Sequence, residues 1–151
     1  FAAAFVVIIA GFFDILDGAL ARHTSQVTNF GALLDSTLDR LAEAVLLLGI
    51  LVLYARDQSL APILIVSIAL VGSMLVSYIR ARAESLNLEC QAGLFTRAER
   101  VVVLALGLLL SQIANVLVIA LAIIVVFSFF TVGQRLIYTW QQTKARDRVN
   151  K

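Results

Sequence analysis

The chain has 151 residues, of which 61% are hydrophobic, with a formal net charge of +2 and a single cysteine. Soluble domains are about 45–50% apolar, and one cysteine excludes an internal disulfide or a cysteine-based metal site. We therefore expect an all-α polytopic membrane protein; a soluble all-α protein is the weaker alternative, because five long apolar segments leave little polar surface.

Five segments are predicted to be membrane-spanning helices, since a helix needs about 20 residues to cross the hydrocarbon. In chain order they are 1–22, 31–54, 60–77, 100–110 and 116–138. Their apolar runs lack the alternation of strands. The chain opens on an apolar run without a basic flank, so we expect residues to be missing upstream, including a further span. Residues 1–151 are predicted to form one domain that ends in a basic tail at 141–151.

If successive spans alternate in direction, one side of the membrane collects almost all of the basic residues. That side carries Arg22, Arg40, Arg80, Arg82, Arg97, Arg100, Arg135, Lys144, Arg146, Arg148 and Lys151. The opposite side carries only Arg56. Loops rich in Lys and Arg face the cytoplasm, so we expect an integral protein of the cytoplasmic membrane with its site on the cytoplasmic side. The tail is interpreted as a solvated segment at the bilayer surface, and no nucleic acid is expected as a partner.

Aspartates lie near the cytoplasmic ends of the first two predicted helices. Asp14 and Asp17 lie on the first helix, and Asp35 and Asp39 lie on the second. On the second helix the aspartates belong to a stripe of residues at four-residue intervals, which share one face: Gly31, Asp35, Asp39 and Glu43. Two acidic stripes on consecutive antiparallel helices can face each other across one cavity.

Carboxylates inside a membrane are costly and rarely face lipid, and four of them in one cavity would repel one another. Divalent cations remove the repulsion, and oxygen-only ligands suit Mg²⁺, Mn²⁺ or Ca²⁺. Two such ions about 3.5–4 Å apart form the usual clamp for displacement at phosphorus. Arg22 and Thr28 are placed to bind phosphate oxygens. The pattern therefore favours a metal-dependent reaction at a phosphate.

Two structural alternatives remain open for these acids. The aspartates could form a network with Arg22 and Arg40, which could neutralise only two of the four. Glu43 lies a turn deeper and could pair with an arginine or a buried hydroxyl instead of taking part in the chemistry. A different class of function, a cation or proton transporter, also uses intramembrane acids; the clustering of the aspartates at one membrane face favours an enzyme.

The stretch from Asp14 to Asp39 resembles the signature of the CDP-alcohol phosphotransferase family, D-x2-D-G-x2-A-R-x8-G-x3-D-x3-D. Every fixed position is occupied, by Asp14, Asp17, Gly18, Ala21, Arg22, Gly31, Asp35 and Asp39. The resemblance implies a six-helix integral membrane enzyme, usually a homodimer, that cleaves the phosphoanhydride of a CDP-linked lipid and releases CMP. The five predicted spans would then be the second to the sixth.

The resemblance also implies roles for individual residues. Asp14, Asp17 and Asp35 would be ligands of two Mg²⁺ or Mn²⁺ ions. Asp39 would be the general base that takes the proton of the acceptor hydroxyl, and also a metal ligand. The CDP part of the donor would be bound by Asp14, Asp17, Gly18, Ala21, Arg22, Thr28 and Gly31.

A second group of basic residues bears on the acceptor. Arg80, Arg82, Arg97 and Arg100 surround one predicted cytoplasmic loop, and Arg135 begins the tail on the same side. These arginines could anchor the protein to anionic lipid, or they could bind the phosphate of a phosphorylated polyol. Arg97 and Arg100 are three residues apart, so they share a helix face.

The surrounding sequence resembles one subgroup of the family. The runs YIRARAE and GLFTRAER are similar to those of the enzymes that make phosphatidylinositol phosphate, or its archaeal ether-lipid counterpart, from inositol 1-phosphate. Thr96 stands where an acid is common, and Ala98 stands where proline is common. The resemblance implies inositol 1-phosphate as the acceptor; glycerol 3-phosphate, free inositol, serine and other alcohols remain alternatives.

Overall fold

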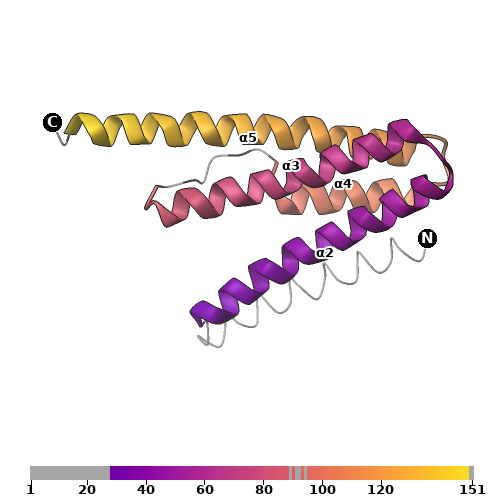
Figure 1. The fold of residues 1–151 in the computed structure, drawn as a ribbon, viewed down its shortest axis with the longest axis horizontal. Coiled ribbons are helices and arrows are strands. Elements are labelled where there is room, and N and C mark those ends of the chain that lie inside the picture. The colour runs from indigo at the N-terminus through magenta and orange to yellow at the C-terminus, as the bar shows by residue number, and fades with distance from the viewer. Residues whose placement is uncertain (1–27, 89, 91–92, 94, 150–151) are drawn as a thin grey trace.

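The computed structural model of the protein describes residues 28–88, 90, 93 and 95–149, and within them every regular element is a helix. Figure 1 shows α2 (Asn29–Arg56), α3 (Leu60–Ser85), α4 (Arg97–Leu109) and α5 (Val116–Val149). The predicted span at 1–22 lies outside the described residues. The prediction of an all-α fold is confirmed for the described part of the chain.

Local sequence signals set the helix boundaries. α2 begins after Thr28, whose hydroxyl accepts a hydrogen bond from the Gly31 N–H at 3.0 Å and so satisfies one of the unpaired donors of the first turn. The chain reverses between α2 and α3 at Gln58, which has a positive φ of 52°. Asn115 has a φ of 66° immediately before α5, and asparagine is one of the few residues that adopts this conformation readily.

α4 begins with a capping box, the reciprocal bonding of the N-cap residue and the residue three positions later. The Glu99 carboxylate accepts hydrogen bonds from the Thr96 N–H, at 2.8 Å, and from the Thr96 hydroxyl. The bond to the Thr96 hydroxyl is the first cause of a pKa for Glu99 below its ordinary value. The box fixes the first turn of α4, which carries Arg97 and Arg100.

The helices pack in the order α2, α3, α5, α4, so that α3 lies between α2 and α5 and α4 lies along α5. One hydrophobic core joins all four helices, and it includes Leu47 of α2, Val66 of α3, Leu104 of α4 and Leu121 of α5. α4 and α5 approach very closely at Gly107, where an added Cβ would lie 2.6 Å from the Cβ of Ala120. This packing places the first turn of α4 against the middle of α2, where Arg97 contacts Asp39 and Arg100 contacts Glu43.

Two helices in the described part are long and apolar enough to cross a membrane. They are α3, in which an 18-residue window has a mean hydropathy of 2.4, and residues Val116–Arg146 of α5, in which such a window has a mean hydropathy of 2.9. α4 has 13 residues and is therefore about 20 Å long, which is shorter than the hydrocarbon core of about 30 Å. The middle of α2 carries Asp39, Arg40 and Glu43. The described residues therefore supply two candidate spans of the five predicted.

Candidate active site

The acidic stripe predicted on the second helix lies on α2. Asp35 is exposed, Asp39 is partly buried and Glu43 is buried, so the stripe runs from the exposed N-terminal turns of α2 into the bundle. Arg40, on the same turns, donates a hydrogen bond from Nη1 to the Ser36 carbonyl oxygen at 2.6 Å. This bond holds one end of the guanidinium on its own helix.

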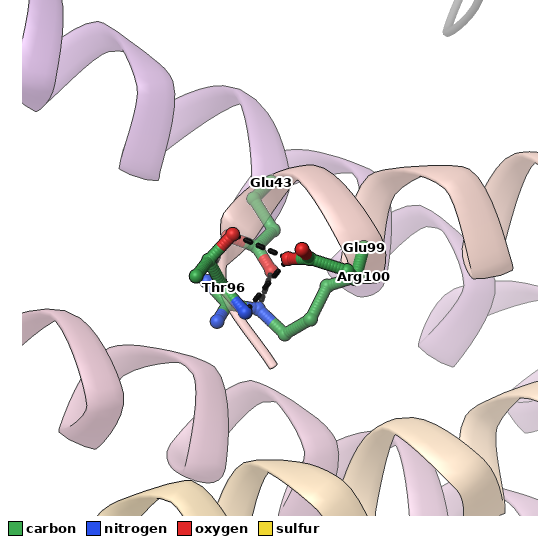
Figure 2. A network of polar contacts seen from close by, with 4 residues as sticks. All are labelled: Glu43, Thr96, Glu99 and Arg100. Atoms are coloured by element: carbon green, nitrogen blue, oxygen red, sulfur yellow. Dashed lines mark hydrogen bonds and ion pairs between the residues drawn. The ribbon is translucent and has the colours of Figure 1, made fainter. Parts of the chain in front are cut away.

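Glu43 pairs with Arg100 of α4. Figure 2 shows the two side chains meeting beside the capping box of α4. Arg100 donates from Nε to Glu43 Oε1 at 2.8 Å and from Nη2 to Glu43 Oε2 at 3.1 Å, a bidentate ion pair. Arg100 is 2% exposed and Glu43 is 8% exposed. The alternative that Glu43 pairs with an arginine is therefore confirmed.

A second ion pair lies one turn nearer the N-terminal ends of α2 and α4. Arg97 Nη1 lies 2.5 Å from Asp39 Oδ2, and both side chains retain some contact with solvent. The residue predicted to be the general base is thus brought against one of the arginines predicted to bind the acceptor. Sequence spacing alone could not show this contact, because it depends on how α4 is placed against α2.

The other arginines predicted for the acceptor lie on α3 and α5. Arg80 donates from Nε to Glu84 at 2.9 Å on the exposed surface of α3, and Arg82 is exposed one turn from the end of the same helix. Arg135 of α5 is 3% exposed and donates from Nη1 to the Val76 carbonyl oxygen at 2.6 Å. The structure therefore brings Arg97 and Arg100 to the aspartates of α2 and commits Arg135 to the contact between α3 and α5.

The segment between α3 and α4 is attached to α5 at two points. Gly93 has a φ of +140°, and a Cβ there would lie 2.9 Å from Thr131 Cγ2 and 3.0 Å from Arg135 Nε, so only glycine fits. Arg146 donates from Nη2 to the Asn87 carbonyl oxygen at 2.6 Å. Arg146 was assigned only to the basic tail, and no signal in the sequence indicates this contact.

The predicted metal ligands are divided between described and undescribed residues. Asp14 and Asp17 lie outside the described residues, as do Gly18, Ala21 and Arg22 of the predicted donor site. Within the described ranges, no group of three or more His, Cys, Asp or Glu side chains could hold a metal ion. Asp35 and Asp39, one turn apart on α2, supply only carboxylate oxygens, and this donor chemistry fits Mg²⁺ or Mn²⁺ rather than a softer metal.

Comparison with known proteins gives consistent matches. The sequence model of CDP-alcohol phosphatidyltransferase matches residues 1–133. The archaetidylinositol phosphate synthase of Methanothermobacter thermautotrophicus is 42% identical, over 89% of this chain and 68% of its own length. The phosphatidylinositol phosphate synthase of Mycobacterium tuberculosis is 37% identical, over 99% of this chain and 71% of its own length.

Two solved structures of the Mycobacterium tuberculosis synthase resemble the fold. The crystal structure with CDP-DAG bound has a TM-score of 0.86 and 35% sequence identity, and the match covers 93% of this chain and 73% of that one. The crystal structure in complex with manganese and citrate has a TM-score of 0.84 and 36% identity, covering 93% of this chain and 70% of that one. At this level of identity the similarity is one of sequence as well as of fold.

Proposed function

We propose, from the premise that this chain belongs to the CDP-alcohol phosphatidyltransferase family, that it transfers a phosphatidyl-type group from a CDP-linked lipid to a phosphorylated polar alcohol and releases CMP. The donor is CDP-diacylglycerol or its ether analogue, and the acceptor is inositol 1-phosphate. The names of the archaeal and mycobacterial relatives support this acceptor. The alternative of a cation transporter has no support among the relatives.

The observation that carries the proposal is the meeting of α4 with α2. Arg97, at the start of α4, lies 2.5 Å from Asp39, so a cationic group suited to a phosphate stands beside the proposed base. A phosphorylated alcohol whose phosphate is bound near Arg97 would have its hydroxyl within reach of Asp39. An acceptor that carries both a phosphate and a hydroxyl would offer the phosphate to the cation and the hydroxyl to the carboxylate.

In the proposed reaction the acceptor hydroxyl oxygen attacks the β-phosphorus of the donor. The bond between that phosphorus and the bridging oxygen breaks, CMP leaves with the α-phosphate, and Asp39 takes the hydroxyl proton. Asp14, Asp17, Asp35 and Asp39 would hold two Mg²⁺ or Mn²⁺ ions, which when bound offset the negative charge of the phosphates. Thr28, the N-cap of α2, and Gly31, one turn before Asp35, would contribute to the donor site with Gly18, Ala21 and Arg22.

The arginines of the proposed acceptor site differ in accessibility. Arg80 and Arg82 are exposed and Arg97 is partly exposed, so a phosphate from solution has access to these three guanidinium groups. Arg100 and Arg135 are buried and bonded within the bundle, to Glu43 and to the Val76 carbonyl oxygen, so they would act on the acceptor indirectly, by holding α4 and α5 in place.

The membrane arrangement is part of the same proposal. We infer five spans in this chain, the second to the sixth of six, in a homodimer whose site faces the cytoplasm. The long apolar surfaces of α3 and α5 support their contact with lipid. The basic residues at the end of α3, the start of α4 and the end of α5 support a cytoplasmic location for these ends. A site at this level gives a lipid donor and a water-soluble acceptor access to the same aspartates.

The proposal is tested by measuring CMP release from CDP-diacylglycerol in detergent or liposomes with Mg²⁺ or Mn²⁺. The acceptor panel contains inositol 1-phosphate, glycerol 3-phosphate, free inositol and serine. Release that requires inositol 1-phosphate supports the whole proposal. Release with another acceptor keeps the reaction and contradicts the acceptor, and no release with any acceptor, from either the ester or the ether donor, contradicts the reaction.

A further inference from the structure

Two ion pairs connect α2 to α4 as successive rungs. The outer rung joins Asp39 to Arg97, and the inner rung joins Glu43 to Arg100. The acids are four residues apart on α2 and the arginines are three residues apart on α4, so each helix presents both members on one face. The outer rung contains the proposed base and a proposed acceptor ligand, whereas Glu43 has no place in the proposed chemistry.

The inner rung is a costly way to stabilise a fold. Removing two charges from water costs several kcal/mol per ion, and replacing a buried ion pair by apolar side chains is often neutral or stabilising. The Arg100–Glu43 pair is also incompletely satisfied, since Arg100 Nη1 is buried and has no hydrogen-bond partner among the residues that the structure describes. A buried polar atom without a partner is rare in native structures and calls for a reason other than stability.

The geometry of the pair supplies that reason. A bidentate bond between a guanidinium and a carboxylate fixes the angle of approach as well as the distance. The capping box of Thr96 and Glu99 makes the first turn of α4 rigid, so fixing Arg100 also fixes the position of Arg97. A shift of about 1 Å in a group that binds substrate can lower the reaction rate about a hundredfold.

We propose that Glu43 is a positioning residue: by holding Arg100 along its Nε and Nη2 edge, it fixes the first turn of α4 so that Arg97 stands beside Asp39. This inference rests on the proposed function, because it assigns Arg97 and Asp39 to the acceptor end of that site. Glu43 acts through Arg100 and does not contact the substrate. The inner rung therefore determines the affinity for the acceptor and leaves the affinity for the donor lipid unchanged.

The test replaces the pair by apolar side chains of similar length, as Glu43→Leu with Arg100→Met. This variant removes both charges together, so it leaves no uncompensated buried ion. We expect its unfolding temperature to be maintained or raised, its acceptor KM to rise about tenfold to a hundredfold, and its donor KM to stay within about twofold. Arg56→Gln, at the opposite end of α2, is the control for the loss of a charge and should change neither KM.

An unchanged acceptor KM in the folded apolar variant, or an equal rise in both KM values, would overturn the proposal. Should the double variant fail to fold, Glu43→Gln decides the question, since it keeps the shape and loses the charge. A several-fold rise of the acceptor KM alone in Glu43→Gln supports positioning, and an unchanged acceptor KM overturns it.

A distance measurement separates this inference from the proposed function. Spin labels at Thr37→Cys of α2 and Ala98→Cys of α4, both exposed positions, report the separation of the two helices in a Cys90→Ala background. We expect the distance distribution to broaden in Glu43→Gln, and an unchanged distribution would overturn the positioning role. If the parent protein releases no CMP with any donor and acceptor, the proposed function fails, while the spin-label result still decides whether Glu43 fixes α4.

Discussion

The close contact between α4 and α5 gives a prediction whose size follows from the structure. A Cβ added at Gly107 would lie 2.6 Å from the Cβ of Ala120, whereas ordinary contacts begin at 3.4 Å. Both atoms are attached directly to helical backbone, so neither can rotate away. In Gly107→Ala the two helices must therefore separate by about 1 Å or remain strained, and such overpacking typically costs about 1–3 kcal/mol.

Helix propensity acts in the opposite direction, because alanine is better than glycine in a helix by about 0.8–1.0 kcal/mol. Gly49 of α2 is a matched control, since a Cβ there would meet nothing within 4 Å. Gly49→Ala gains the propensity without the clash. The difference between the two variants isolates the packing cost of about 1–3 kcal/mol, which corresponds to about 2–12 °C in unfolding temperature at about 2–4 °C per kcal/mol.

Cys90 provides the assay for this comparison. It is the single cysteine of the chain and is 3% exposed, so a thiol-reactive fluorophore labels it when the protein unfolds on heating. We expect Gly107→Ala to unfold at a lower temperature than Gly49→Ala, and Gly107→Ala combined with Ala120→Gly to recover most of the loss. Equal unfolding temperatures for the two single variants, or no recovery in the double variant, would refute the close-packing explanation.

Three further predictions concern the site and its supports. Asp39→Asn removes the proposed base and should lower kcat by about 10²–10⁴-fold; metal-dependent CMP release at the parental rate would contradict the role. Arg82→Ala should raise the acceptor KM by about tenfold or more, as expected for the loss of a charged hydrogen bond, with the donor KM unchanged; equal KM values in the variant and its parent would leave Arg82 only a membrane-anchoring role. The hydrogen bond from Thr96 lowers the pKa of Glu99 below its usual 4.5. The ionised Glu99 carboxylate therefore stabilises the fold fully above pH 4.5, and this stabilisation is lost as the pH falls through the lower pKa of the folded state. Glu99→Gln should therefore lose less stability than its parent in that acid range, and parallel loss in both proteins would show that the capping carboxylate is not responsible.

The apolar parts of the fold could be predicted from the sequence, and the polar ends of the helices could not. The start of α2 was predicted within two residues, at 31 against Asn29. α3 was predicted to end at 77 but continues to Ser85, and α5 was predicted to end at 138 but continues to Val149. Hydropathy reports the part of a helix that lies in lipid, and these extensions carry Arg, Glu, Lys and Gln side chains that remain helical outside the apolar run.

The start of α4 is marked in the sequence by a signal that hydropathy does not report. Thr96 and Glu99 have the spacing of a capping box, which places the helix start at Arg97 instead of at residue 100. The acidic stripe of α2 could be predicted because it depends only on the period of one helix. The pairing of Glu43 with Arg100 could not be assigned to that arginine, because 57 residues separate the two in the chain and only the packing of four helices brings them together.

The central claim is that this chain joins a CDP-linked lipid to a phosphorylated polyol. Its most direct test is to supply inositol 1-phosphate labelled in its phosphate and to follow the label into the lipid fraction in the presence of Mn²⁺. We predict that the label enters the lipid in proportion to the CMP released, and that Asp39→Asn lowers both rates by the same factor, about 10²–10⁴-fold. CMP release without labelled lipid, or labelling that persists when divalent ions are chelated, would contradict the account.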